Sequence, residues 1–337
     1  MNKVVVTGIT GFLGSHIAIQ LLKKGYKVLG TLREISRASE IKNIIGKHTD
    51  KVANIGFIEA NLMDGLEKWV EVTKDQDYII NVASPFPSVM PKNDMELVEP
   101  AKKGILTILE AATINRVKKV VHTSSTGAAV YGERKKGTFT EKDWTNEHNK
   151  KDTTAYFRSK TIAEKAAWAF LERTQDAPKF TTILPGLILG PVLERDFGNS
   201  ANLVKKFLDG SVPAIPQVGY ELIDVRSVAD LHLKAMESEK ANGQRFVATN
   251  GYVKLKEVAG HLKMAYPDKK IPKMLLPDFL VRIFSLIDKE TQPLLTELNS
   301  ERKVDATKAK TLLDWNPISN EKAILDCAET LYKHNIL

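Results

Sequence analysis

A tyrosine and a lysine four residues apart could carry out acid–base chemistry in this chain. Tyr156 and Lys160 belong to the run YFRSK, within a pattern that predicts a helix over about 153–174. Residues four apart lie on one face of a helix, so the two side chains project side by side. A phenol has a reference pKa of about 10 and exchanges protons poorly at neutral pH. We expect the lysine cation to lower the pKa of Tyr156, so that the tyrosine can exchange a proton with a carbonyl or alcohol oxygen.

Serine hydroxyls follow the apolar run that precedes this helix. Residues 118–123 read as a buried strand, and Ser124 and Ser125 come directly after it. The carboxyl ends of strands in an open parallel sheet face the ligand crevice, so a hydroxyl there could hold a substrate oxygen near Tyr156. For Thr123, at the end of the strand, we expect a turn-capping role.

Three glycines form the third chemical signal. Gly8, Gly11 and Gly14 follow a valine-rich strand over residues 3–7 and precede a helical pattern over about 12–24. Glycine allows a tight turn and a close approach of the backbone to a pyrophosphate, while the helix start offers free N–H groups to the anion. Strand, glycine turn and helix together predict a dinucleotide cradle. The alternative is a tight turn with no ligand.

The elements that must position these residues alternate along the chain. Strands are predicted at 3–7, 26–31, 55–59, 78–82, 118–123 and 180–184, and helices at about 12–24, 36–46, 64–73, 94–115 and 153–174. This alternation predicts an α/β fold, a Rossmann-type doubly wound parallel sheet with helices on both faces. After residue 190 the rhythm breaks over a stretch rich in Pro, Gly and Asn. A strand at 222–225, a helix at 227–237, a strand at 244–249 and a helix from 256 follow, and the end is largely helical.

We therefore expect a Rossmann domain over 1–185 and a smaller, mixed α/β cap over 186–337, with residues of about 222–250 returning to the first domain. The chain has 337 residues, 43% of them hydrophobic, a formal net charge of +8 and a single cysteine, Cys327. One cysteine excludes an internal disulfide. Lysines alternate with acids, which favours a solvated surface over a nucleic-acid site, and the histidines show no metal-binding spacing. We expect no metal, no membrane span, no signal peptide and a cytoplasmic location.

The motifs carry a family resemblance. The run TGITGFLG at 7–14 resembles the T-G-x-x-G-F-x-G motif of extended short-chain dehydrogenases/reductases. The helix YFRSKTIAEKAAW at 156–168 is similar to that of dihydroflavonol 4-reductases, cinnamoyl-CoA reductases and microbial methylglyoxal or aldehyde reductases. The resemblance implies that substrate binds between the two parts of the chain. It implies Ser125, rather than Ser124, as the substrate-orienting serine, Tyr156 as proton donor, and Lys160 as the group that tunes Tyr156 and binds the ribose.

Two arginines bear on the choice of cofactor. Arg33 follows the second strand, where an acidic residue would favour NAD and an arginine accommodates a 2′-phosphate, and Arg37 follows within a helical turn. Glu34 could instead serve the ribose, but we expect NADP(H). The resemblance implies further cofactor contacts from the glycine turn, from the ends of later strands and from a loop at the nicotinamide: Gly8, Thr10, Gly11, Phe12, Leu13, Gly14, Asn61, Leu62, Val82, Ala83, Ser84, Pro185, Leu187 and Ile188.

The predicted activity is NADPH-dependent reduction of an aldehyde or ketone to the alcohol, with no nucleic-acid or membrane partner and a monomeric or homodimeric assembly. Substrate contacts are expected from Phe86, Thr126 and Gly127 in apolar loops. One alternative is an NAD-dependent sugar-nucleotide epimerase or dehydratase, in which Arg195, Lys205, Lys206 and Arg226 would grip a second pyrophosphate. A second alternative is a non-catalytic NADP-sensing regulator.

Overall fold

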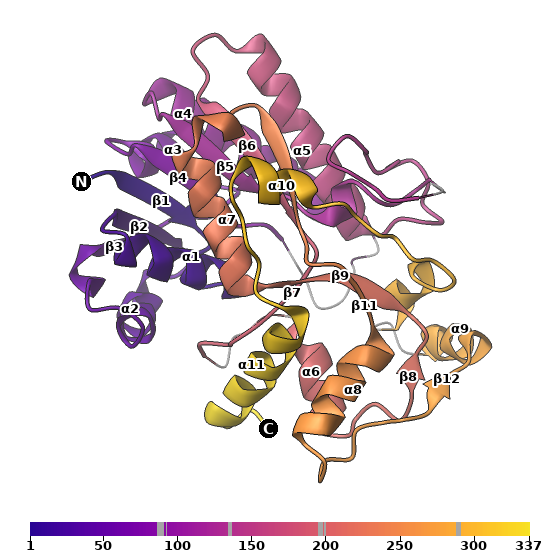
Figure 1. Cartoon of the computed structure of the whole chain (residues 1–337). Coiled ribbons are helices and arrows are strands. Elements are labelled where there is room, and N and C mark those ends of the chain that lie inside the picture. Colours follow the sequence, from indigo (N-terminus) through magenta and orange to yellow (C-terminus); the bar gives the residue numbers. More distant parts are fainter. Residues whose placement is uncertain (86–90, 92, 134–136, 195–197, 199, 288–290) are drawn as a thin grey trace.

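A seven-stranded parallel sheet forms the centre of the molecule (Figure 1). The computed structural model describes residues 1–85, 91, 93–133, 137–194, 198, 200–287 and 291–337. The strand order is β10-β6-β5-β4-β1-β2-β3, and every pair of neighbours is parallel. The strands are β1 (Lys3–Thr7), β2 (Lys27–Leu32), β3 (Ile55–Glu59), β4 (Tyr78–Asn81), β5 (Lys119–Thr123), β6 (Lys179–Pro185) and β10 (Gln244–Ala248). Val4, Val5 and Val6 are fully buried, as a strand covered on both faces requires.

Helices cover both faces of this sheet, which confirms the doubly wound α/β prediction. One apolar core lies under α1 (Phe12–Lys23), α2 (Ala38–Gly46) and α7 (Val225–Glu237). The other lies under α3 (Leu66–Thr73), α4 (Met95–Ile114) and α5 (Ala155–Arg173). The five helices predicted in the first half are thus present, with ends shifted by a few residues.

The remaining elements build a cap with its own apolar core, gathered below the sheet in Figure 1. A three-stranded sheet has the order β11-β9-β7, and a two-stranded one pairs β12 with β8. The cap elements are β7 (Leu187–Leu189), α6 (Ala201–Leu208), β8 (Ile215–Pro216), β9 (Gly219–Asp224), β11 (Tyr252–Lys254), α8 (Leu255–Ala265), β12 (Leu275–Leu276), α9 (Asp278–Ile287), the 3-10 helix η5 (Gln292–Thr296) and α11 (Asn320–Lys333). No helix is predicted between residues 190 and 222, but α6 forms there, and its buried Ala201, Val204 and Phe207 follow helical spacing.

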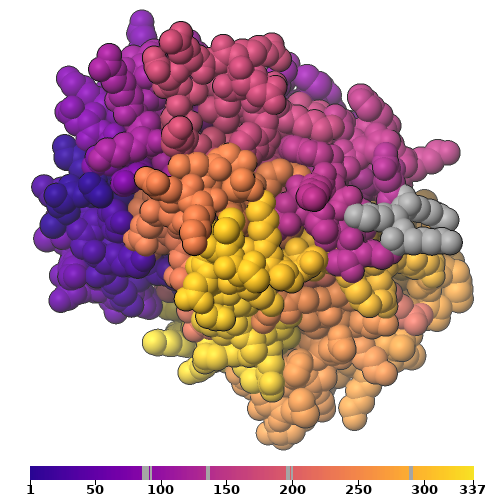
Figure 2. Space-filling view, turned by 45° about the horizontal axis from the view of Figure 1, so that its top comes forward, coloured from indigo at the N-terminus to yellow at the C-terminus, as the bar shows by residue number. Residues whose placement is uncertain are grey.

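The two parts interlock. After β9, which belongs to the small sheet, the chain returns to the large one through α7 and β10. A second return comes near the end, where α10 (Thr307–Leu312) and Trp315 pack into the core beside α7. The indole Nε1 of Trp315 donates to the Ser227 carbonyl at 2.9 Å. In Figure 2 the orange and yellow residues lie directly against the indigo and magenta ones, without a separating linker.

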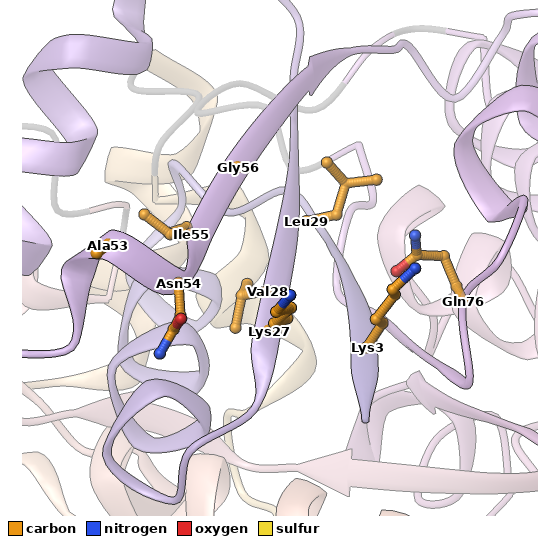
Figure 3. A pocket seen from close by; sticks show the side chains of 9 residues that line it. All are labelled: Lys3, Lys27, Val28, Leu29, Ala53, Asn54, Ile55, Gly56 and Gln76. Atoms are coloured by element: carbon orange, nitrogen blue, oxygen red, sulfur yellow. The ribbon is translucent and has the colours of Figure 1, made fainter. Parts of the chain in front are cut away.

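An open hollow lies at the amino-terminal ends of β1, β2 and β3 (Figure 3). Its polar lining comes from Lys3, Lys27, Asn54 and Gln76, and none of the predicted site residues belongs to it. Ligands of open α/β sheets bind at the carboxyl ends of the strands, so this hollow lies at the wrong end to be the crevice.

No helix among the described residues is long and apolar enough to cross a membrane. The same residues contain no cluster of His, Cys, Asp and Glu side chains that could hold a metal ion.

Candidate active site

The glycine turn between β1 and α1 is as tight as the sequence predicts. Gly8 has a φ of +65°, and the Gly11 N–H donates to the Gly8 carbonyl at 3.0 Å. A Cβ added to Gly14 would lie 2.3 Å from the Gly8 carbonyl oxygen, so only glycine fits there. Gly11, at the start of α1, has no side chain that could cap the first turn. The turn therefore leaves backbone N–H groups of a helix start available to an anion such as a pyrophosphate.

A network of buried polar side chains joins the carboxyl ends of β1, β4 and β5. The Thr7 hydroxyl donates to Asn81 Oδ1 at 2.7 Å and accepts from the N–H groups of Val82 and Ala83 at 3.0 Å. Asn81 Nδ2 lies 3.0 Å from His122 Nδ1. Burial lowers the pKa of His122 well below its usual value, so the ring is a neutral acceptor for the amide. These hydrogen bonds fix the backbone after β4, where the half-buried residues Val82, Ala83 and Ser84 lie.

The structure brings Ser125, Tyr156 and Lys160 together at the end of β5. The Thr154 hydroxyl accepts from the Phe157 N–H at 3.3 Å and begins α5 just before the tyrosine. The phenol of Tyr156 hydrogen-bonds the Ser125 side chain. Lys160 Nζ donates to the Thr123 carbonyl at 3.0 Å and lies 6.0 Å from the centroid of the Tyr156 ring.

The electrostatics of this trio differ from the expectation. Burial raises the pKa of Tyr156 to about 12, while the hydrogen bond with Ser125 acts in the opposite direction. Burial also lowers the pKa of Lys160 to about 8, partly offset by the nearby Glu164 carboxylate. The pKa of Tyr156 is therefore raised in the protein alone, and not lowered as the spacing of Tyr156 and Lys160 predicts. The physical reason is that desolvation outweighs an ammonium group that bonds to the Thr123 carbonyl rather than to the phenol.

The three hydroxyls at the end of β5 have different tasks. Ser125 Oγ accepts from the Gly127 N–H at 3.0 Å, which leaves its own proton free to be donated. Ser124 Oγ donates to Glu164 Oε2 at 2.6 Å, away from Tyr156. Thr123 Oγ1 lies 2.8 Å from His232 Nε2, so the turn-capping role expected for Thr123 belongs to Ser125 instead.

Glu164, one helical turn after Lys160, connects the elements that lie beneath the site. It was not singled out from the sequence. It is fully buried and accepts from Thr182 Oγ1 and from Arg245 Nε, each at 2.8 Å. A buried carboxylate needs such partners, so Glu164 ties α5 to β6 and β10. An acid at four-residue spacing from Lys160 was the available sequence signal.

The predicted adenosine end of the crevice lies beside β2. Arg33 is exposed and has no ion-pair partner among the described residues. Arg37 Nε lies 3.1 Å from Glu40 Oε2, and its Nη2 lies 3.5 Å from Glu194 Oε2. The Asn61 side chain accepts from the Met63 N–H at 3.1 Å, which leaves its amide nitrogen as the group for a ligand. These residues fit a 2′-phosphorylated adenosine, with Arg33 as the readily available cation.

The other predicted residues have varied positions. Phe12 and Thr10 are half-buried at the turn, whereas Leu13 is buried in the core. Leu62 packs against Gly104 of α4. Pro185 ends β6, Leu187 and Ile188 pair with β9, and Thr126 and Gly127 form the short 3-10 helix η3 (Thr126–Ala128). Phe86 lies outside the described residues.

Three of the four cations considered for a second pyrophosphate lie among the described residues and have partners. Arg226 Nη2 lies 2.6 Å from both Asp224 Oδ2 and Asp326 Oδ2. Lys205 Nζ lies 2.9 Å from Asp209 Oδ2, and Lys206 also has a partner. Arg195 lies outside the described residues.

Comparisons with known proteins agree with this architecture. The sequence profile of the NAD dependent epimerase/dehydratase family matches residues 4–248. The ketoreductase azaE of Aspergillus niger is 33% identical over 307 residues, which cover 83% of this chain and 87% of the relative. The NADPH-dependent methylglyoxal reductase GRE2 of Saccharomyces cerevisiae is 32% identical over 285 residues, covering 79% and 83%.

Solved structures show the same similarity. The yeast methylglyoxal/isovaleraldehyde reductase Gre2 complexed with NADPH has a TM-score of 0.82 and 26% identity, covering 99% of this chain and 100% of that one. The Gre2–NADPH complex from Candida albicans has a TM-score of 0.81 and 25% identity, covering 99% of each chain. The chain therefore belongs to the NAD dependent epimerase/dehydratase family, the extended short-chain dehydrogenases/reductases.

Proposed function

We propose that this protein is an NADPH-dependent carbonyl reductase that converts an aldehyde or ketone to the alcohol. The observation that carries the proposal is the convergence of Ser125, Tyr156 and Lys160 at the carboxyl end of β5, with the phenol hydrogen-bonded to Ser125. The similarity to reductases named for NADPH and methylglyoxal supports the same reaction class.

NADPH, when bound, supplies the hydride that adds to the carbonyl carbon. Ser125 donates its hydroxyl proton in a hydrogen bond to the carbonyl oxygen and fixes its position near the phenol. Tyr156 then gives its proton to that oxygen as negative charge develops there. The Lys160 ammonium stabilises the phenolate that remains. With a pKa raised to about 12, Tyr156 carries this proton across the whole neutral pH range.

Different residues of the crevice would hold different parts of the cofactor. The glycine turn would hold the pyrophosphate through backbone N–H groups, and Arg33 the 2′-phosphate. Val82 and Ala83, fixed by Thr7, would border the ribose. Lys160 lies at the end of the neighbouring strand β5, where it bonds to the Thr123 carbonyl.

The two alternatives have weaker support. A sugar-nucleotide epimerase would need cations for a second pyrophosphate, but Arg226 and Lys205 are neutralised by carboxylates. A non-catalytic sensor would have no use for a tyrosine and a lysine at catalytic spacing, and this chain retains both.

Replacement of the phenol tests the proposal. Tyr156→Phe removes one oxygen, so we expect turnover to fall at least 1,000-fold, with NADPH affinity within threefold of wild type. NADPH oxidation with a panel of aldehydes and ketones, NADH serving as the comparison, gives the rate, and NADPH fluorescence gives the affinity. Tyr26→Phe is the matched control, because Tyr26 bonds to Glu237 on the surface and should retain full activity. Turnover above a tenth of wild type in Tyr156→Phe would exclude Tyr156 as the proton donor.

A further inference from the structure

One aromatic ring touches both halves of the catalytic apparatus. The Phe157 ring follows Tyr156 on α5 and lies over the turn that Ser125 caps. A Cβ added to Gly127 would lie 2.4 Å from Phe157 Cδ1, so the ring rests directly on this backbone. Because the Gly127 N–H donates to Ser125 Oγ, a shift of the Phe157 ring would move both the serine and the tyrosine.

One face of the Phe157 ring is covered by Tyr131. Their rings stack with centroids 3.8 Å apart and planes 12° from parallel. The Tyr131 hydroxyl donates to Glu297 Oε1 at 2.7 Å, and the Arg302 guanidinium carbon lies 4.5 Å from the Tyr131 ring centroid. Tyr131 is therefore held both at its hydroxyl and at its face by residues far along the chain.

Arg302 is itself fixed by three oxygens. Its Nη1 donates to Glu297 Oε2 at 3.2 Å and to the Thr296 carbonyl at 2.7 Å, and its Nη2 donates to Asp152 Oδ1. Asp152 Oδ2 accepts from the Gly132 N–H at 2.9 Å, next to Tyr131. A planar guanidinium can satisfy such a set at fixed angles, which a lysine ammonium cannot do equally well.

This arrangement is costly for a purely structural purpose. Glu297 is only 4% exposed, and burial raises its pKa, so the charged pair pays a desolvation cost. Apolar residues of the same volume often stabilise a fold as well as a buried ion pair does. An ion pair also fixes the positions of its partners. Here the residues that it positions contact the segments that carry Ser125 and Tyr156, the two side chains proposed to bind the substrate oxygen.

We propose that Arg302 and Glu297 are positioning residues that set the distance between the Ser125 hydroxyl and the Tyr156 phenol through the stacked rings of Tyr131 and Phe157. This inference rests on the proposed carbonyl reductase function and extends it. The segment 297–302 follows η5 in the cap, so the cap completes the active site by orienting residues of the Rossmann part. Neither Arg302 nor Glu297 needs to touch the substrate.

Kinetics of four variants of the full-length chain, with a fifth as control, test the inference. We expect Arg302→Met to lower kcat 10- to 100-fold with NADPH affinity within twofold of wild type, and Arg302→Lys to recover only part of the loss. Glu297→Gln should lower kcat less, and the double variant Glu297→Gln/Arg302→Met should be no worse than Arg302→Met alone, because the two residues act as a unit. Lys119→Met is the control: a buried cation at the other end of β5, bonded to Ala235 and Ser238 carbonyls, that should reduce stability but not kcat.

Hydrogen exchange separates this inference from the proposed function. If the proposal is right, Arg302→Met should speed exchange of the Gly127 and Phe157 amides at least tenfold, whereas Lys119→Met should leave them unchanged. This readout needs no substrate, so it holds even if wild type reduces no carbonyl compound and the proposed function fails. A folded Arg302→Met variant with wild-type exchange at these amides, or with kcat within twofold of a turning-over wild type, would overturn the positioning role.

Discussion

The Rossmann part and the cap are held together in different ways. The central strands carry continuous apolar residues such as Val4, Val5 and Val6, which are fully buried. The cap has short strands, a smaller core and an α9 whose Phe279, Leu286 and Ile287 are 61%, 84% and 84% exposed. The continuous buried sheet therefore carries the glycine turn and the trio of Ser125, Tyr156 and Lys160, whereas the cap meets this part through contacts such as that of Glu297 with Tyr131. This difference predicts that the same substitution changes NADPH binding more in the Rossmann part than in the cap.

A matched pair of helical glycines should show the largest contrast. Gly14→Ala places a Cβ 2.3 Å from the Gly8 carbonyl in the Rossmann part, so we expect NADPH affinity to fall at least 100-fold. Gly260→Ala in α8 meets nothing within 4 Å and should stabilise the cap by about 1 kcal/mol without a change in binding. Fluorescence titration with NADPH measures both. Binding within threefold of wild type in Gly14→Ala would contradict the close-packed cradle.

Trp315 tests whether the two parts unfold as one. Its side chain is fully buried in the core beside α7 and bonds to Ser227. We expect Trp315→Ala to lower the free energy of unfolding by roughly 3–5 kcal/mol, with a single transition seen by far-UV circular dichroism and by NADPH release. Two separated transitions would mean that the cap and the sheet are independent folding units.

Buried histidines should make the fold sensitive to acid. Burial lowers the pKa of His16 and of His232 to about 4, from about 6.5 in the unfolded chain. Between these values the unfolded state binds more protons, so stability is full above about pH 6.5 and falls as the pH drops toward 4, by roughly 3 kcal/mol for each imidazole. Urea unfolding across this range measures the slope, and His232→Gln should flatten it. An unchanged slope would mean that His232 titrates normally in the fold.

Replacement of Arg33 should give the smallest change in cofactor affinity and the one most selective between NADPH and NADH. Arg33→Ser removes the exposed cation beside β2, so we expect NADPH affinity to fall 10- to 100-fold and NADH affinity to stay within twofold. Arg173→Ser, which replaces another exposed arginine at the end of α5, is the control for net charge. Equal losses for the two cofactors would remove Arg33 from the choice between them.

Much of the first half could be predicted because local pattern and tertiary structure agree there. Each buried parallel strand is an apolar run, and each helix between strands is amphipathic, so the alternation predicts the doubly wound sheet. The cap was harder to predict: no helix was predicted at α6, and β7, β8, β11 and β12 are two or three residues long. Such short strands have no period of their own and form only when neighbours pair with them.

At the site, the sequence alone determined which residues are chemically suited to the reaction. Gly8 and Gly14 permit the turn, Tyr156 and Lys160 share a helix face, and a serine ends the preceding strand, all of which follow from residue type and short spacing. Tertiary structure decided the rest: that Ser125 rather than Ser124 meets the phenol, that burial raises rather than lowers the pKa of Tyr156, and that Glu297 and Arg302 contact Tyr131, whose ring stacks on Phe157. The physical reason is the distance along the chain over which each effect acts. Helical spacing and backbone conformation act over a few residues, whereas desolvation and ion pairing depend on groups that only folding brings together.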